Sequence, residues 1–97
     1  MTALPTAIHL EIVTPERMLV REEIDEVVVP GEDGYLGVLP GHTPLVATLK
    51  VGELWYRKGQ EKTRVPIAGG FAEVLPDRVT ILAEVPADND GTDVPRA

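Results

Sequence analysis

The sequence predicts an all-β protein, either a sandwich or a barrel. Apolar and polar residues alternate with a period of two along most of the chain, as they do in strands with one buried face. Turn signals that contain Gly or Pro separate these runs at intervals of about 8–12 residues. No segment keeps the helical period over three turns. The 97 residues suffice for one domain with a core of its own.

The first half of the chain predicts three strands. The first is expected at residues 8–12, because three large aliphatic residues alternate there with a histidine and a glutamate. A Thr-Pro-Glu turn follows, and strand composition resumes at residues 18–20. Residues 24–29 form the next predicted strand, since most of them are β-branched. The Pro-Gly-Glu-Asp-Gly sequence after this run predicts a turn, because proline presets φ and Asp-Gly tolerates a positive φ.

The second half of the chain predicts further short strands separated by glycine or proline. Gly52 and the Gly69-Gly70 pair are interpreted as turns at which one strand ends and another begins. Residues 78–85 alternate apolar and polar side chains clearly. The strands are expected at residues 45–49, 54–57, 61–67, 71–75 and 78–85.

Composition excludes several classes of function. Nine Lys and Arg against sixteen Asp and Glu give a net charge of −7, which disfavours binding to nucleic acid or to an anionic membrane surface. The chain contains no cysteine and no serine, so catalysis by either nucleophile, disulfides and thiolate metal sites are excluded. Met1 to Pro5 lacks a signal-peptide pattern, and no apolar run approaches the ~18 residues of a membrane helix, so a soluble protein is expected.

No catalytic, cofactor or metal site is predicted. His9 and His42 are 33 positions apart and have no glutamate at ligand spacing. His9 falls on the polar face of its strand, where an exposed or cross-strand-paired residue is expected. His42 lies in a Pro-Gly-His-Thr-Pro loop and is either a turn residue or a contact residue.

Residues 33–44 are the most unusual segment, with three Gly, two Pro and four large apolar residues in twelve positions. A compact loop that presents Tyr35 and Leu36 near its tip would suit docking to another protein. A crossover between sheets, with the apolar residues filling the core, fits the same composition. Residues 87–97 are polar and acidic, so we expect a domain at residues 1–86 followed by a disordered tail.

Four motifs occur in the order and at the spacing of a known family. They are Leu-Glu-Ile-Val-Thr-Pro-Glu at residues 10–16, Gly-Tyr-Leu-Gly-Val-Leu-Pro-Gly-His-Thr-Pro-Leu at 34–45, Gly-Gly-Phe-Ala-Glu-Val at 69–74 and Arg-Val-Thr-Ile-Leu-Ala at 78–83. By these motifs the sequence resembles the epsilon subunit of the F-type ATP synthase, called delta in mitochondria. The resemblance covers nearly the whole chain, from Ile8 to Val85.

This resemblance implies a β-sandwich of roughly ten short strands and a non-catalytic subunit of the central stalk. The subunit would bind gamma and the c-ring, and so couple proton flow to ATP synthesis, without a cofactor and as a monomer when isolated. The residues that the resemblance assigns to the c-ring contact are Glu32, Asp33, Gly34 and Tyr35. Those that it assigns to the gamma contact are Thr14, His42 and Ala47.

The end of the chain departs from the family pattern. Many bacterial relatives continue into a helical hairpin, whose opening motif Asp93, Arg96 and Ala97 match before the sequence stops, so a short or C-terminally truncated form is expected. The resemblance places the protein on the cytoplasmic side of the bacterial plasma membrane, touching the membrane only through the c-ring, with a thylakoid location less expected. A small all-β interaction module with a different partner remains the alternative.

Overall fold

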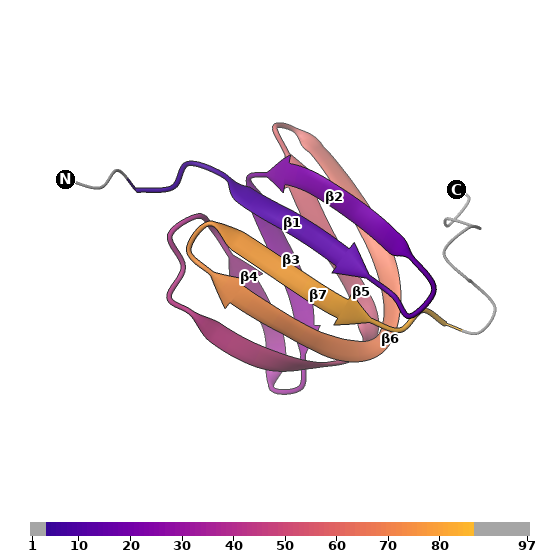
Figure 1. Cartoon of the computed structure of the whole chain (residues 1–97). Coiled ribbons are helices and arrows are strands. Elements are labelled where there is room, and N and C mark those ends of the chain that lie inside the picture. The colour runs from indigo at the N-terminus through magenta and orange to yellow at the C-terminus, as the bar shows by residue number, and fades with distance from the viewer. Residues whose placement is uncertain (1–3, 87–97) are drawn as a thin grey trace.

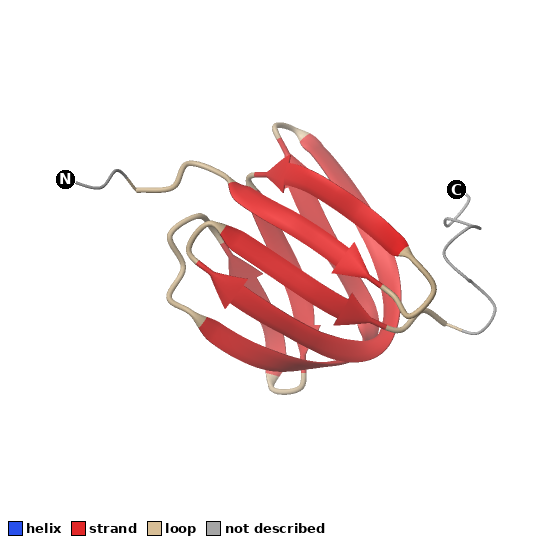
Figure 2. Ribbon diagram, viewed as in Figure 1, coloured by secondary structure: helices blue, strands red, loops and turns tan. Residues whose placement is uncertain are grey.

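The computed structural model describes residues 4–86, which form a single seven-stranded sheet and contain no helix (Figure 2). The strands are β1 (Ile8–Val13), β2 (Met18–Ile24), β3 (Glu26–Gly31), β4 (Gly34–Val38), β5 (Leu45–Lys58), β6 (Glu61–Leu75) and β7 (Arg78–Ala83). Their order in the sheet is β2-β1-β7-β6-β5-β3-β4. Neighbours are antiparallel except β1 and β7, which are parallel. Within residues 4–86 there is accordingly no helix that could span a bilayer.

The sheet folds over on itself into two layers because β5 and β6 are long and strongly curved. They run for 14 and 15 residues and pair with each other along nearly their whole length. In Figure 1, β1, β2 and β7 lie in the front layer, β3 and β4 lie behind, and β5 and β6 pass from one layer to the other. The all-β sandwich is therefore confirmed. Within the described residues the structure has seven strands and not the roughly ten that the resemblance implies, and β5 and β6 each span two of the strands expected from the sequence.

The bend in β6 depends on Gly70, which pairs with Leu49 on one side and with Ala83 on the other. Its φ is +142°, and a Cβ there would run into the carbonyl oxygen of Leu82 and lie 2.9 Å from the Cα of Ala83. Only glycine fits this backbone position. The glycine pair that was interpreted as a turn is thus a kink inside a continuous strand, as glycine often is at the corners of sheets.

The bend in β5 leaves a gap in its pairing with β3. Between the pairs Val28–Trp55 and Gly31–Leu49, β3 advances by three residues and β5 by six. The extra residues of β5 include Gly52, the second predicted turn, which also lies within the strand. Such irregularities increase the local twist and curvature of a strand.

The core lies between the two layers and is built from the predicted alternation. Ile8, Leu10 and Ile12 of β1 are completely buried, while His9 and Glu11 point outward, as expected. The other buried core residues are Ile24, Val27, Val29, Val38, Leu49, Leu54, Tyr56, Ile67, Ala72, Val74, Val79, Ile81 and Ala83. Each large aliphatic side chain removed from water contributes about 1.5–3 kcal/mol before conformational entropy is subtracted.

The segment at residues 33–44 contains a strand that was not predicted. Residues 34–38 form β4, in which Val38 is buried and Leu36 packs against the core, whereas Tyr35 is exposed. The connection that follows is held by a hydrogen bond from the Gly41 N–H to the Pro76 carbonyl, 2.8 Å. The core-filling interpretation therefore holds for Leu36 and Val38, whereas docking through the exposed Tyr35 stays a prediction. The predicted tail at residues 87–97 lies outside the described residues, so the division at residue 86 stays a prediction.

Candidate interaction site

The residues assigned to the c-ring contact lie at the turn between β3 and β4. Glu32 and Asp33 form a two-residue connection between the paired residues Gly31 and Gly34, and this hairpin projects at the bottom of Figure 1. Gly34 has a φ of +130°, which a residue with a side chain rarely adopts. The two carboxylates are exposed and take part in none of the ion pairs found within residues 4–86. The turn is therefore an exposed acidic projection.

A shallow depression lies beside this turn, and we call it the tip groove. It is lined by residues 31–36 and 45–48 and has a volume of about 530 Å³. Half-buried apolar side chains of Leu36, Leu45 and Ala47 line part of it. Tyr35 is 59% exposed and lies opposite Pro30 in the β3–β4 register. Acidic, aromatic and aliphatic groups thus converge at one end of the sandwich.

The structure does not gather the three residues assigned to gamma into one cluster. Ala47 belongs to the tip groove. His42 lies in the β4–β5 connection, where its Nδ1 is 2.7 Å from the carbonyl oxygen of Thr43. This connection is tied to Pro76, and the adjacent Asp77 carbonyl accepts from the His9 N–H at the start of β1. Thr14 follows the other end of β1, about 16 Å along the strand from His9.

Thr14 is itself buried, with 6% of its surface exposed. Its hydroxyl donates to the Arg17 carbonyl at 3.0 Å and accepts from the Arg17 N–H at 3.2 Å. A further hydrogen bond of 2.8 Å joins the Thr14 N–H to the same carbonyl. This side chain therefore closes the β1–β2 turn from within and presents little surface to a partner.

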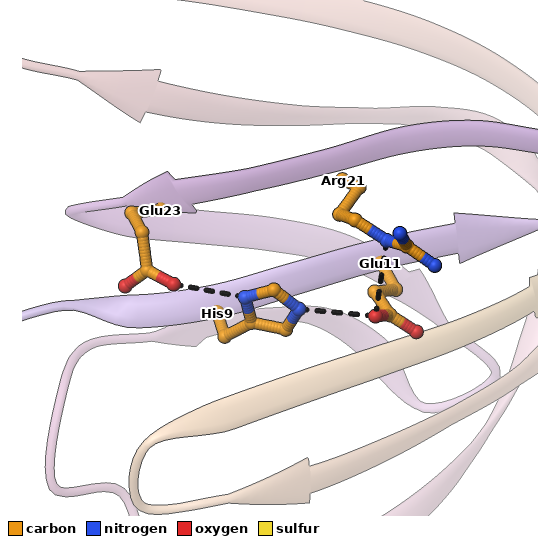
Figure 3. Close-up of polar contacts among 4 residues, drawn as sticks. All are labelled: His9, Glu11, Arg21 and Glu23. Atoms are coloured by element: carbon orange, nitrogen blue, oxygen red, sulfur yellow. Dashed lines mark hydrogen bonds and ion pairs between the residues drawn. The ribbon is translucent and has the colours of Figure 1, made fainter.

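A polar cluster on the outer face of the front layer surrounds His9 (Figure 3). Its Nδ1 is 2.8 Å from Glu23 across the β1–β2 pair, and its Nε2 is 3.0 Å from Glu11 on the same strand. Arg21 lies 3.5 Å from the same Glu11 oxygen. Hydrogen bonds to Glu23 and then Glu11 raise the pKa of His9, and the bond from His9 lowers the pKa of Glu11. The expected cross-strand partner of His9 is thus present.

The two carboxylates approach opposite nitrogens of the imidazole, so the three side chains do not converge on a single point. Within residues 4–86, no group of His, Asp or Glu is arranged to hold a metal ion. The cluster is suited to joining β1 to β2 electrostatically.

An apolar row on the same outer face was missed in the sequence. Phe71, Leu82, Val13 and Met18 are consecutive partners across β6, β7, β1 and β2. Phe71 and Leu82 are each more than half exposed. A groove of about 330 Å³ borders them, lined by residues 13–15, 70–71 and 82–84. The alternation contained the signal, because both residues occupy outward positions beside the buried Ala72 and Ile81.

Comparison with known proteins identifies relatives of this sandwich. Residues 7–86 match the family described as "ATP synthase, Delta/Epsilon chain, beta-sandwich domain". The chain is 49% identical to the ATP synthase epsilon chain of Solibacter usitatus, over 97% of its own length and 70% of that protein. It is 56% identical to the ATP synthase epsilon chain of Syntrophobacter fumaroxidans, over 93% of its own length and 67% of that protein. It is 48% identical to the ATP synthase epsilon chain of Koribacter versatilis, over 92% of its own length and 63% of that protein.

Solved structures show the same fold. A chain in the Euglena gracilis mitochondrial ATP synthase structure, described as OSCP/F1/c-ring, superposes with a TM-score of 0.80 at 28% identity. The match covers 84% of this chain and 53% of that one. A chain of the Tetrahymena thermophila mitochondrial central stalk and c-ring superposes with a TM-score of 0.68 at 14% identity, which shows the fold alone. The present chain thus spans about half of the Euglena chain and about two thirds of its bacterial relatives.

The family match, the identities near 50% and the superposition all agree with the two-layered sheet described above. The chain therefore belongs to the delta/epsilon chain family of the ATP synthases and carries the β-sandwich domain of that family.

Proposed function

We propose that the chain is a central-stalk subunit of a proton-translocating F-type ATP synthase, bound to both the gamma subunit and the c-ring. In this role it is a structural element that couples proton flow to ATP synthesis and is not itself an enzyme. The family match across residues 7–86 is the observation that carries the proposal. The location that follows is the cytoplasmic side of the bacterial plasma membrane, with membrane contact only through the c-ring.

The shape of the domain supports this role. Torque can cross a joint only if the joint does not yield, and a close-packed protein interior has low compressibility. Here two strands of 14 and 15 residues pass through both layers, so the layers are connected by continuous backbone. Sliding of one layer over the other would have to break the paired backbone of β5 and β6.

The c-ring contact is proposed at the β3–β4 turn. Glu32 and Asp33 are exposed, close together and held on a short hairpin, which suits a contact with polar or basic loops. The gamma contact is proposed at Ala47 and His42. Thr14 would act there only indirectly, by fixing the β1–β2 turn.

Binding of the folded chain to gamma and to the c-ring, each prepared separately from Syntrophobacter fumaroxidans, tests the proposal. The wild-type chain is expected to bind both. The double variant Glu32→Lys/Asp33→Lys should lose c-ring binding and keep gamma binding. The matched control is Glu16→Lys/Glu22→Lys, which changes the charge equally at exposed positions on and before β2. A folded wild-type chain that binds neither partner at micromolar concentration would disprove the proposed function.

A further inference from the structure

The sandwich is open on the side where the tip groove lies. β4 is the last strand in the sheet order and pairs with β3 alone. Residues 45–47 of β5 pair only with β6, because the β3–β5 ladder reaches no further than Leu49 and the Thr48 carbonyl accepts a last hydrogen bond, 2.9 Å, from the Glu32 N–H. The tip groove lies between these two strand edges and is lined by residues of both. Two free edges of backbone therefore border one depression.

The register identifies the backbone groups that face outward from β4. Gly31 and Gly34 close a two-residue turn, so this pair exchanges hydrogen bonds. Bonded and non-bonded pairs alternate along an antiparallel ladder. Tyr35 and Gly37 therefore direct their N–H and C=O groups away from β3. The partner of Tyr35 is Pro30, which has no N–H, in agreement with a non-bonded pair.

The edge of β4 lacks the features that usually prevent strands from pairing with it. Its sequence, Gly-Tyr-Leu-Gly-Val, contains no charged residue and no proline. The opposite edge of the sheet, β2, carries the exposed charges of Arg21, Glu22 and Glu23. Charged side chains therefore protect the β2 edge against pairing with another strand, and the β4 edge has no such protection.

We propose that β4 accepts an extended segment of the gamma subunit as an additional strand. This rests on the proposed function, which makes gamma a partner. The inward side chains of the added strand cover the half-buried Leu36 and Leu45 of the tip groove. The added strand also passes Ala47, the residue of the tip groove that is proposed above as a gamma contact.

Amide hydrogen exchange with and without purified gamma tests this directly. In the free chain, the N–H groups of Tyr35 and Gly37 should exchange rapidly and those of Leu36 and Val38 slowly, because only the latter two face β3. Gamma should slow exchange at Tyr35 and Gly37. The same measurement is repeated with the c-ring alone, and with the chain alone at high concentration. These two controls show whether the c-ring or a second copy of the chain binds this edge instead of gamma.

A backbone variant provides a second test. Gly37→Pro removes the outward N–H, and proline is tolerated on an edge strand when its nitrogen faces solvent. The matched control is Gly37→Ala, which keeps the N–H and whose Cβ would meet only a Val28 methyl at 3.9 Å. We expect gamma affinity to fall about tenfold for Gly37→Pro, as for the loss of one intermolecular hydrogen bond, and to stay within about twofold for Gly37→Ala.

The outcomes separate this proposal from the proposed function. Gamma binding without protection of Tyr35 and Gly37 would overturn the added strand and leave the stalk role standing. Protection by the c-ring alone, or by a second copy of the chain, would overturn gamma as the occupant. Failure of the wild-type chain to bind gamma at all would overturn both proposals together.

Discussion

Replacing Gly70 with alanine should destabilise the domain severely although it adds a single methyl group. The added Cβ would collide with the Leu82 carbonyl oxygen and lie 2.9 Å from the Cα of Ala83, both of them backbone atoms of the paired strand β7. A side chain cannot rotate away from such a contact, so β6 and β7 must separate. Forced overpacking costs about 1–3 kcal/mol. The φ of +142° adds about 1–2 kcal/mol for a residue that has a Cβ.

We therefore expect a loss of about 3 kcal/mol in the free energy of unfolding. For a domain of this size, that corresponds to a fall in Tm of about 12–24 °C. The assay is thermal and urea unfolding, followed by the fluorescence of Trp55, the only tryptophan in the chain. Circular dichroism of the same samples establishes whether the variant still folds as an all-β protein.

Gly59→Ala is the matched control. Gly59 also has a positive φ, +61°, but nothing lies within 4 Å of the position that its Cβ would take. This variant should lose about 1 kcal/mol in the free energy of unfolding, which is the cost of the positive φ without a steric collision. Equal losses for the two variants would refute the collision at the β6 bend as the reason for glycine at position 70.

Three further predictions concern pH, the β1–β2 turn and the core. The raised pKa of His9 means that its contribution to stability is complete below about pH 6.5 and is lost as the pH rises through the folded-state pKa; the Tm difference between wild type and His9→Gln should shrink from about pH 5.5 to about pH 9, and a constant difference would contradict this. Thr14→Val should cost about 1–2 kcal/mol in urea unfolding by removing both hydrogen bonds of its hydroxyl, whereas Thr14→Ser should restore them. Ile81→Ala, at a completely buried position, should cost about 2–5 kcal/mol, and Leu82→Ala at the neighbouring exposed position under about 1 kcal/mol in the same assay.

The fold class was predictable because local alternation records which face of a strand is buried. The alternation of Ile8, Leu10 and Ile12 with His9 and Glu11 was enough to orient β1 correctly. The number of strands was not predictable in the same way. A glycine inside an apolar run produces either a reversal or a kink, and the choice depends on what lies beside it. For Gly70 the deciding neighbour is β7, which comes later in the sequence.

The candidate site was predictable only in part, and for a similar reason. The acidic turn at Glu32 and Asp33 follows from a local Pro-Gly-Glu-Asp-Gly sequence. The tip groove exists only because the curvature of β5 carries Leu45 and Ala47 opposite β4. No local pattern contains that juxtaposition. The burial of Thr14 likewise results from the closed turn with Arg17, and its residue type alone gave no sign of it.

The parallel pairing of β1 with β7 has a consequence for synthesis on the ribosome. β1 lies between β2 and β7 in the sheet, with Leu10 opposite Val79 and Ile12 opposite Ile81. The first strand to leave the exit tunnel therefore has one of its two neighbours missing until the last strand follows. Such distant pairings are slow to form, because the intervening chain must be ordered before they contribute. The domain should fold in a single late step, and its nascent form should remain a chaperone client until β7 has emerged.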